Sequence, residues 1–379
     1  MSPARTKVLA VMLVVAALGL SGCGPSTDAE KRVRAALKAT ERLSRSYLYS
    51  ETFTDKAGSH DTTVLGFVED DFRYKAHVTV GGRPTLDESV NDDALAVRFL
   101  DPARIGDFLR RPTKQDKGGS GLGADKTAAS PVATKAKTGP TAAELLPTHR
   151  WVLDPAGAPA VVGTPSGDRL VGADPVLDSL DVLAYVERSI GEADRIVEFS
   201  EDSLEYKKAE DPFEHPKKGS GVVRYDFEAP KLPKASQTAN GNQVTPDTRH
   251  FRKLSVYVKD GRVVQVAEKI DVAARLKDLA EIYDTKFPAD RSKDQLAVIA
   301  IDALNAIRQG QGQQPVRLRS MEFKLADLGG SVKVDMPTDT TTASLALLEN
   351  RGRAADAAVG AVEAAALAAT LAAPPPPPS

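Results

Sequence analysis

The feature of this sequence that most constrains its fold is a nine-residue segment in which apolar and polar side chains alternate. From Phe72 to Val80, apolar residues occupy every second position, and arginine, lysine, histidine and threonine occupy the others. Side chains of a β-strand point to opposite faces of the sheet in turn, so this period predicts a strand with one apolar face. Gly81-Gly82 follow and predict a turn. The segment therefore predicts part of a sheet with one apolar and one polar face.

Three neighbouring segments predict strands of the same sheet. Residues 47–53 are rich in aromatic and β-favouring side chains, and residues 62–69 and 94–100 have the same apolar character. Because short turns join them, we expect an antiparallel meander. Later strands are expected at residues 150–153, 196–206, 222–227, 251–258, 262–270, 316–325 and 331–336.

Three helices are expected to accompany these strands. Residues 28–44 and 175–190 each carry an apolar stripe, with charged residues elsewhere on the first. Ser292 and Gln295 form the pattern of a capping box at the start of a third helix, over residues 292–310. Such one-sided helices fit against the apolar face of a sheet.

Stability must come from packing, because the chain has a single cysteine and can form no internal disulfide. Aromatic residues make up only 5% of the chain, so the core is expected to be mostly aliphatic. Some 350 residues would remain after removal of residues 1–22, which are described next as an export signal. This length is enough for one large or two ordinary domains.

Residues 1–22 have the pattern of an export signal: two cations precede an uncharged apolar run of 13 residues at 8–20, too short to span a bilayer. The next residues, Leu20-Ser21-Gly22-Cys23, resemble the lipobox of bacterial lipoproteins. The resemblance implies cleavage between Gly22 and Cys23 and a diacylglyceryl group on the thiol of Cys23. We therefore expect a lipid-anchored chain on the extracytoplasmic face of the cell membrane. An ordinary cleaved signal followed by an incidental cysteine is the alternative.

Charge excludes one class of partner. Without the signal, which holds two of the 50 Lys+Arg, 48 cations face 52 Asp+Glu, a formal charge near −4. No strong basic field exists, so nucleic acid is not an expected partner. After the signal, no run of 18 uncharged apolar residues occurs, and no second membrane span is expected.

Composition divides the mature chain into parts. Residues 23–27 are a short polar tether, and residues 28–337 carry the expected elements. Polar stretches at 112–147 and 231–249 are expected to be mobile insertions, since they offer little apolar surface to bury; a domain boundary is the alternative for the first. Residues 338–379 form an Ala/Pro-rich tail, expected to be flexible rather than a partner-binding helix.

Five stretches, in this order, carry a wider resemblance: Ser46–Phe53, Phe72–Ala76, Trp151–Leu153, Val256–Val264 and Phe323–Pro337. Together they resemble the extracytoplasmic lipoproteins of the LolA/LppX-like family, the group of LppX, LprA, LprF and LprG. The resemblance implies an α+β fold: a curved antiparallel, incompletely closed β-barrel with helices packed on its concave face. It also implies an apolar cavity that takes acyl chains.

Inward-facing positions of the expected strands are candidates for the cavity wall. Periodicity does not distinguish residues that line a cavity from residues that fill a core. The candidates are Phe72, Tyr74, Val78, Val97, Tyr225 and Val256.

No catalytic residue, metal site or cofactor is predicted. The five histidines lie apart, outside metal-binding spacings, and Gly219-Ser220-Gly221 lacks the pattern of a nucleophile elbow. Two non-enzymatic functions remain. The first is a membrane-anchored carrier or sensor of a lipid or other amphiphile. The second is an envelope interaction or regulatory module with a filled core, whose protein partner the sequence does not identify.

Overall fold

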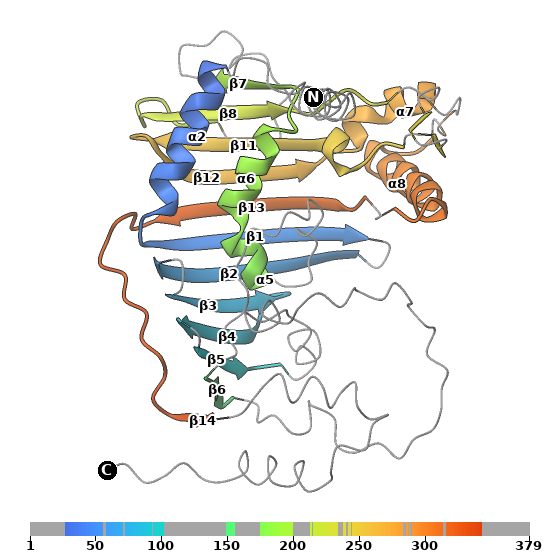
Figure 1. Ribbon diagram of the computed structural model, residues 1–379. Helices are drawn as coiled ribbons and strands as arrows, with labels where there is room; N and C mark the ends of the chain where they lie inside the picture. Colours follow the sequence, from blue (N-terminus) through green and yellow to red (C-terminus); the bar gives the residue numbers. More distant parts are fainter. Residues whose placement is uncertain are drawn as a thin grey trace, which may run out of the picture.

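One large β-sheet organises the chain, as the computed structural model shows (Figure 1). Neighbouring strands are antiparallel except at one edge, where β14 and β6 run parallel. In sheet order the twelve strands are β14 (Thr340–Thr342), β6 (Trp151–Asp154), β5 (Ala94–Phe99), β4 (Arg83–Asn91), β3 (Arg73–Val80), β2 (Gly58–Asp70), β1 (Arg45–Asp55), β13 (Leu318–Ala326), β12 (Arg262–Ile270), β11 (Arg252–Lys259), β8 (Val222–Glu228) and β7 (Arg195–Phe199).

The sheet does not close into a barrel, because β14 and β7 are its two edges and lie at opposite ends (Figure 1). A separate pair joins β9 (Thr238–Ala239) and β10 (Asn242–Gln243). The structure describes residues 27–55, 58–70, 73–92, 94–101, 149–155, 175–199, 213, 215–233, 238–239, 242–243, 245–282, 286, 288, 290–313 and 316–342.

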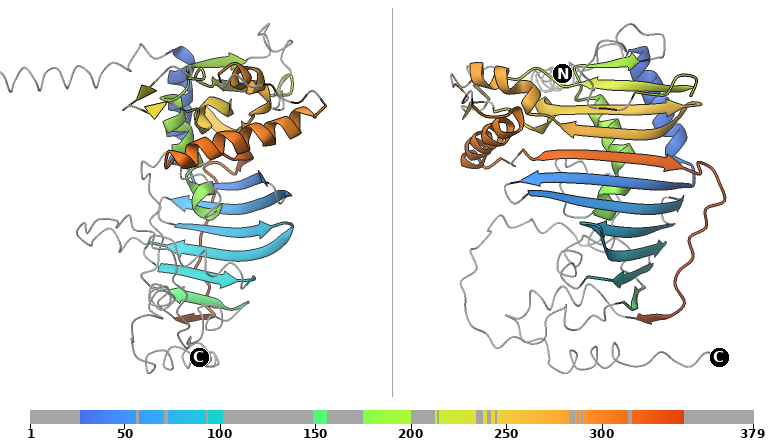
Figure 2. Two further views of the ribbon diagram at one scale, coloured as in Figure 1. Left: turned by 90° about the vertical axis from the view of Figure 1, so that its right-hand side faces the viewer. Right: turned by 180° about the vertical axis from the view of Figure 1, so that it is seen from behind.

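Helices α2 (Asp28–Glu41), α5 (Pro175–Leu180) and α6 (Val182–Ile190) lie on one face of the sheet (Figure 1). Helices α7 (Leu276–Ile282) and α8 (Lys293–Gly310) pack together beside one end of β11, β12 and β13 (Figure 2). Short 3-10 helices η4 (Thr248–Phe251) and η5 (Ala273–Arg275) lead into β11 and α7.

The predicted helix starts are confirmed. The side chain of Thr27 accepts a bond from the backbone N–H of Glu30 at 3.2 Å and caps α2. Ser292 and Gln295 form the expected reciprocal capping box of α8. The helix expected over 175–190 is instead two helices, α5 and α6, separated at Asp181.

The apolar core has two parts. The larger lies between the sheet and helices α2, α5 and α6, and includes inward-facing residues of every strand from β6 across the sheet to β7. The smaller joins α7 and α8 to the ends of the neighbouring strands and contains Phe251, Ile270, Val272, Leu276, Leu279, Ala297, Ala300, Ile301, Leu304 and Val316. Aliphatic residues predominate in both, as the composition predicts.

A glycine in the central strands allows one close contact between sheet and helix. Gly66 of β2 lies opposite Tyr47 of β1, and a Cβ at Gly66 would overlap the Tyr47 ring. The ring therefore lies across β2, and its hydroxyl is 2.9 Å from Oγ of Ser179 in α5. Because Gly66 has no side chain, Tyr47 can hold α5 against the sheet.

Two strand predictions are wrong. Residues 83–91 form β4, although the sequence predicts that the chain passes from the turn at Gly81-Gly82 to a strand at 94–100. Residues 331–336 form no strand; residues 331–339 instead form a strap from β13 to β14 (Figure 1). The strap is held by the backbone N–H of Val334, which donates to Oε2 of Glu69 at 2.9 Å. It brings β14 against β6, so the sheet gains an additional edge strand.

Candidate functional site

Five of the six predicted cavity residues face the helices. The side chains of Tyr74, Val78, Val97, Tyr225 and Val256 are all at most 3% exposed and belong to the larger core cluster. The sixth, Phe72, lies outside the described residues, as do Gly22 and Cys23. Alternation in the sequence therefore assigned the correct face of the sheet to these five positions.

The structure brings these residues together in two groups. Tyr225 and Val256 are cross-strand partners on β8 and β11. Tyr74, Val78 and Val97 lie on β3 and β5, on the other side of β2, β1, β13 and β12. The candidate positions thus mark both ends of the helix-covered face.

One candidate takes part in a buried polar contact. The hydroxyl of Tyr74 donates to Oε1 of Glu88 on β4 at 2.5 Å, and the side chains are 2% and 0% exposed. Glu88 lies opposite Val97 of β5, so this carboxyl group is within the face that was expected to be apolar. The hydrogen bond offsets part of the cost of burying the carboxylate.

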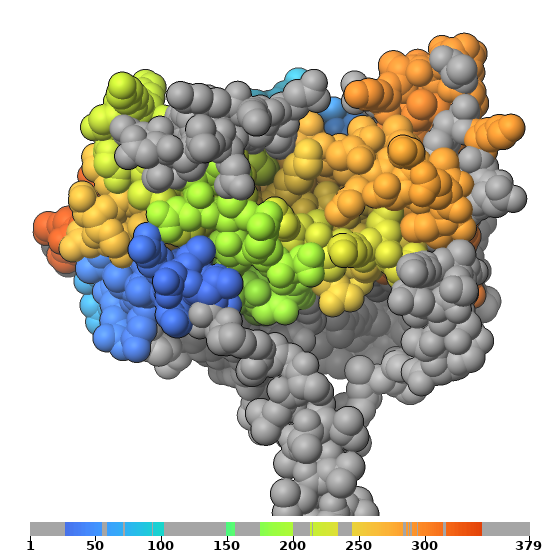
Figure 3. Space-filling view, turned by 90° about the horizontal axis from the view of Figure 1, so that it is seen from above, coloured from blue at the N-terminus to red at the C-terminus, as the bar shows by residue number. Residues whose placement is uncertain are grey.

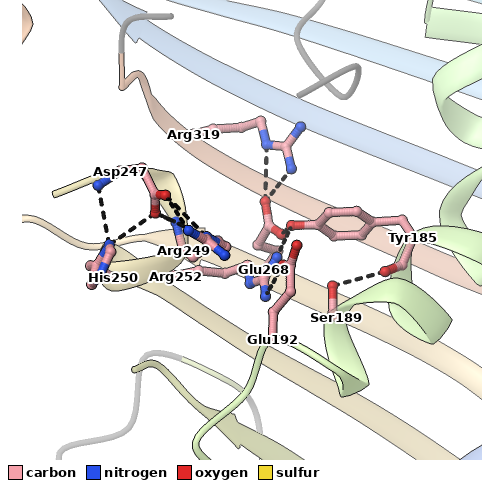
Figure 4. Close-up of polar contacts among 9 residues, drawn as sticks. All are labelled: Tyr185, Ser189, Glu192, Asp247, Arg249, His250, Arg252, Glu268 and Arg319. Carbon is pink, nitrogen blue, oxygen red and sulfur yellow. Dashed lines mark hydrogen bonds and ion pairs between the residues drawn. The ribbon is translucent and has the colours of Figure 1, made fainter. Parts of the chain in front are cut away.

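A larger buried polar cluster occupies the face beneath α6 (Figure 4). Its centre is Glu268 of β12, which is 1% exposed. Nε of Arg319, from β13, donates to Oε1 of Glu268 at 3.0 Å, and Nη1 of Arg319 lies 3.5 Å from Oε1 of Glu51 on β1. The hydroxyl of Tyr185, from α6, donates to the other oxygen of Glu268. We call Glu51, Tyr185, Glu192, Arg252, Glu268 and Arg319 the Glu268 cluster.

Arg252 connects this cluster to the end of α6. Its Nη1 donates to the hydroxyl of Tyr185 at 3.3 Å, and its Nη2 donates to Oε2 of Glu192 at 2.9 Å. The guanidinium carbons of Arg252 and Arg319 lie 5.5 and 6.0 Å from the centre of the Tyr185 ring. Helix α6 is therefore joined to the sheet by charge as well as by apolar packing.

The strand register explains this convergence. Glu51 and Glu268 both lie opposite Met321 of β13, one from each side. Arg319 is two residues before Met321 and points to the same face, so it reaches both carboxylates diagonally. The alternation of Arg319, Met321 and Phe323 could have identified this arginine as inward-facing from the sequence. The sequence gives no signal for its partners, which lie far along the chain.

Burial and charge shift the pKa values of the cluster in definite directions. Burial raises the pKa of the Glu51 carboxyl, and Arg319 and the nearby Tyr49 hydroxyl act in the opposite direction. Burial, followed by the charge of Glu268, raises the pKa of Tyr185. Burial alone would lower the pKa of Arg319, but Glu268 and the other surrounding acidic groups raise it. The cluster contains three carboxyl groups, of Glu51, Glu192 and Glu268, and two guanidinium groups, of Arg252 and Arg319.

A capping box fixes the chain just before Arg252 (Figure 4). The side chain of Asp247 accepts from the backbone N–H of Arg249 at 3.0 Å, and Nδ1 of His250 lies 2.9 Å from Oδ1 and 3.1 Å from the backbone N of Asp247. Burial would raise the pKa of Asp247, but the bonds from His250 and Arg249 outweigh it and lower that pKa. The box caps η4, which leads directly into β11.

Seen from above, α2 and α6 lie side by side over this end of the sheet (Figure 3). The arrangement offers an apolar layer between sheet and helices, with buried hydrogen-bonding groups at two places within it. Within the described ranges, no group of three or more His, Cys, Asp or Glu residues could hold a metal ion. No helix among those ranges is long and apolar enough to cross a membrane.

The geometry defines the class of the fold: an α+β protein with one open, mostly antiparallel sheet and helices on one face, as the sequence predicts. Among solved structures, LprF from Mycobacterium bovis matches with 9% identity and a TM-score of 0.31, over 83% of this chain and 99% of that chain. A match at this identity and TM-score carries no argument about the fold, the ligand or the activity of this chain. No protein-family model and no curated protein matches the chain.

Proposed function

We propose that this protein is an extracytoplasmic lipoprotein that binds a lipid or other amphiphile between its sheet and its helices, and that it performs no catalysis. The observation that carries this proposal is the one-sided apolar face. It extends across the sheet from β6 to β7, and among the described helices only α2, α5 and α6 lie over it. An acyl chain needs an extended apolar surface of this kind.

The Glu268 cluster and the Tyr74–Glu88 pair fit the same function. An amphiphile has a polar end, and that end requires hydrogen-bonding groups wherever it is removed from water. Both polar places lie within the apolar face, and several groups in the Glu268 cluster donate or accept hydrogen bonds. The acyl chain would then contact the apolar face, and the head group would contact the buried hydrogen-bonding groups within it.

The membrane anchor is the second part of the proposal. Leu20-Ser21-Gly22-Cys23 supports cleavage before Cys23 and attachment of acyl chains to its thiol. Two acyl chains hold a protein at a bilayer where one chain binds only marginally, at about 0.8 kcal/mol for each buried CH₂. Replacement of Cys23 by Ala should move the protein from the membrane fraction to the soluble fraction; retention in the membrane would contradict the anchor.

An envelope interaction module with a filled core is the competing function. The observation in its favour is the complete burial of Val97 and Val256, both 0% exposed within an aliphatic cluster. Organic extraction of the purified, unacylated protein followed by mass spectrometry separates the two functions. Stoichiometric lipid supports the carrier, and repeated recovery of none supports the module.

A packing variant gives a second, independent measurement. In an interior with room for acyl chains, Val256→Phe should lower the free energy of unfolding by less than about 1 kcal/mol and reduce the recovered lipid. In a filled core the added ring should cost about 1–3 kcal/mol. Val272→Phe is the matched control, because Val272 is also 0% exposed but belongs to the smaller core cluster. The control should show the full cost in either case.

A further inference from the structure

The first helix of the described chain begins at an edge of the sheet. Nη1 of Arg32, in the second turn of α2, donates to Oε2 of Glu198 on the edge strand β7 at 2.9 Å. At the other end of the helix, Oγ1 of Thr40 accepts from the backbone N–H of Val263 on β12 at 2.9 Å. Helix α2 therefore crosses from β7 toward the centre of the sheet, and its N-terminus lies at the β7 edge (Figure 1).

The chain between the proposed anchor and this helix is short. Cys23 is separated from Thr27, the N-cap of α2, by Gly24, Pro25 and Ser26. Four residue steps reach at most about 14 Å even when fully extended. An acylated Cys23 would therefore hold the start of α2 close to the head groups of the bilayer.

We propose that the edge formed by β7 and the first turn of α2 faces the membrane, and that its partner there is the lipid head-group layer. This inference rests on the lipid anchor of the proposed function. Twelve strands spaced about 4.8 Å apart place β14 roughly 50 Å from β7. The line that runs across the sheet from β7 to β14 is then perpendicular to the bilayer plane. β14 and the strap lie at the end away from the membrane.

The side chains at this edge agree with contact at the head-group level. Asp28, Lys31, Arg32 and Arg195 are exposed and charged. Charged side chains remain in the hydrated head-group layer and do not enter the hydrocarbon. The exposed large apolar side chains of the described chain lie elsewhere: Leu48, Leu65 and Phe67 on β1 and β2, and Ile299 and Ile307 on α8.

This orientation has a consequence for ligand exchange. Tyr225, one of the predicted cavity residues, is 3% exposed, and its hydroxyl interacts with Arg32 and Glu198. These two side chains form the ion pair between α2 and β7. The part of the interior next to Tyr225 would thus be nearest the bilayer. An amphiphile that moves between the bilayer and the protein would pass this part of the interior first.

Energy transfer from single labels to a lipid dye tests the orientation. Cys23 is the only cysteine, so in the acylated full-length protein an introduced cysteine is the only free thiol. We would label Arg195→Cys on β7, Lys75→Cys on β3 and Thr342→Cys on β14, all exposed, in vesicles that carry an acceptor in their head groups. Transfer should be highest at position 195, intermediate at 75, and several-fold lower at 342.

Equal transfer at the three positions, or the reverse order, would overturn the orientation. The same samples are first floated on a density gradient. Protein that does not float with the vesicles contradicts the anchor itself, so the two failures are distinguishable. As a matched control, an insertion of about 20 Gly/Ser residues between Gly24 and Pro25 adds a flexible span of roughly 25 Å and should reduce the difference between positions 195 and 342.

Discussion

Removal of the Arg319 charge tests whether the Glu268 cluster holds the sheet and α6 together. Arg319→Met keeps much of the side-chain length but leaves Glu268 and Glu51, 1% and 6% exposed, without this guanidinium. Breaking a buried pair by removal of one partner costs about 3–5 kcal/mol, because a buried charge loses its compensation. Such a loss is a large part of the 5–15 kcal/mol that stabilises an ordinary domain.

Urea unfolding, monitored by circular dichroism, gives the difference in the free energy of unfolding between each variant and the wild-type chain. The double variant Arg319→Met/Glu268→Gln should recover part of the loss, since the uncompensated charge at Glu268 is then absent. Arg319→Lys keeps the charge and provides a variant that folds if the Met variant does not. A loss below about 1 kcal/mol for Arg319→Met, or an additive double variant, would refute the coupling between these side chains.

Three other changes give separate tests. Gly66→Ala should lower the free energy of unfolding by about 1–3 kcal/mol, since the new methyl group overlaps the Tyr47 ring; an unchanged urea midpoint would contradict this contact. Tyr74→Phe removes a hydrogen bond to the buried Glu88 carboxylate and should cost about 1.5–3 kcal/mol in the same assay; no loss would mean that the bond contributes nothing. Glu51 has a folded-state pKa raised above its ordinary value of 4.5, so its contribution to stability is complete below that value and is lost as pH rises through the folded pKa. As pH rises above 4.5, Glu51→Gln should therefore lose less stability than the wild-type chain, and parallel pH profiles would contradict the shift.

The sequence predicts strands well where burial is one-sided and apolar. Residues of β3 alternate without interruption, and the structure confirms both the strand and its inward face. The next strand, β4, contains Asp87 and Glu88, and acidic residues are unfavourable in isolated strands. Both are buried because neighbouring side chains bind them: Arg98 and His77 bind Asp87, and Tyr74 binds Glu88. Such compensation depends on the three-dimensional structure, so composition could not reveal it.

The strap shows the opposite failure. Residues 331–336 alternate between polar and apolar positions and therefore resemble a strand, but they connect β13 to β14 without pairing in the sheet. Alternation shows that a segment could pair, and it does not show whether a strand edge is available. For the candidate site, period two identified the faces of Tyr74 and Tyr225. The Glu268 cluster instead required partners from β1, α6 and β13, which lie far from Glu268 in the chain.

The central pairing of the sheet has a consequence for how the protein is made. β1 pairs with β13, and the side chains of Ser46 and Asp327, bonded at 2.6 Å, are 281 residues apart in the chain. In a chain delivered from its N-terminus, β1 appears long before β13, so one side of β1 stays unpaired until most of the polypeptide is present. Pairings between such distant segments slow folding and leave unpaired edges open to wrong partners. Fragments that end before residue 318 would therefore keep β1 as an open edge, which favours aggregation.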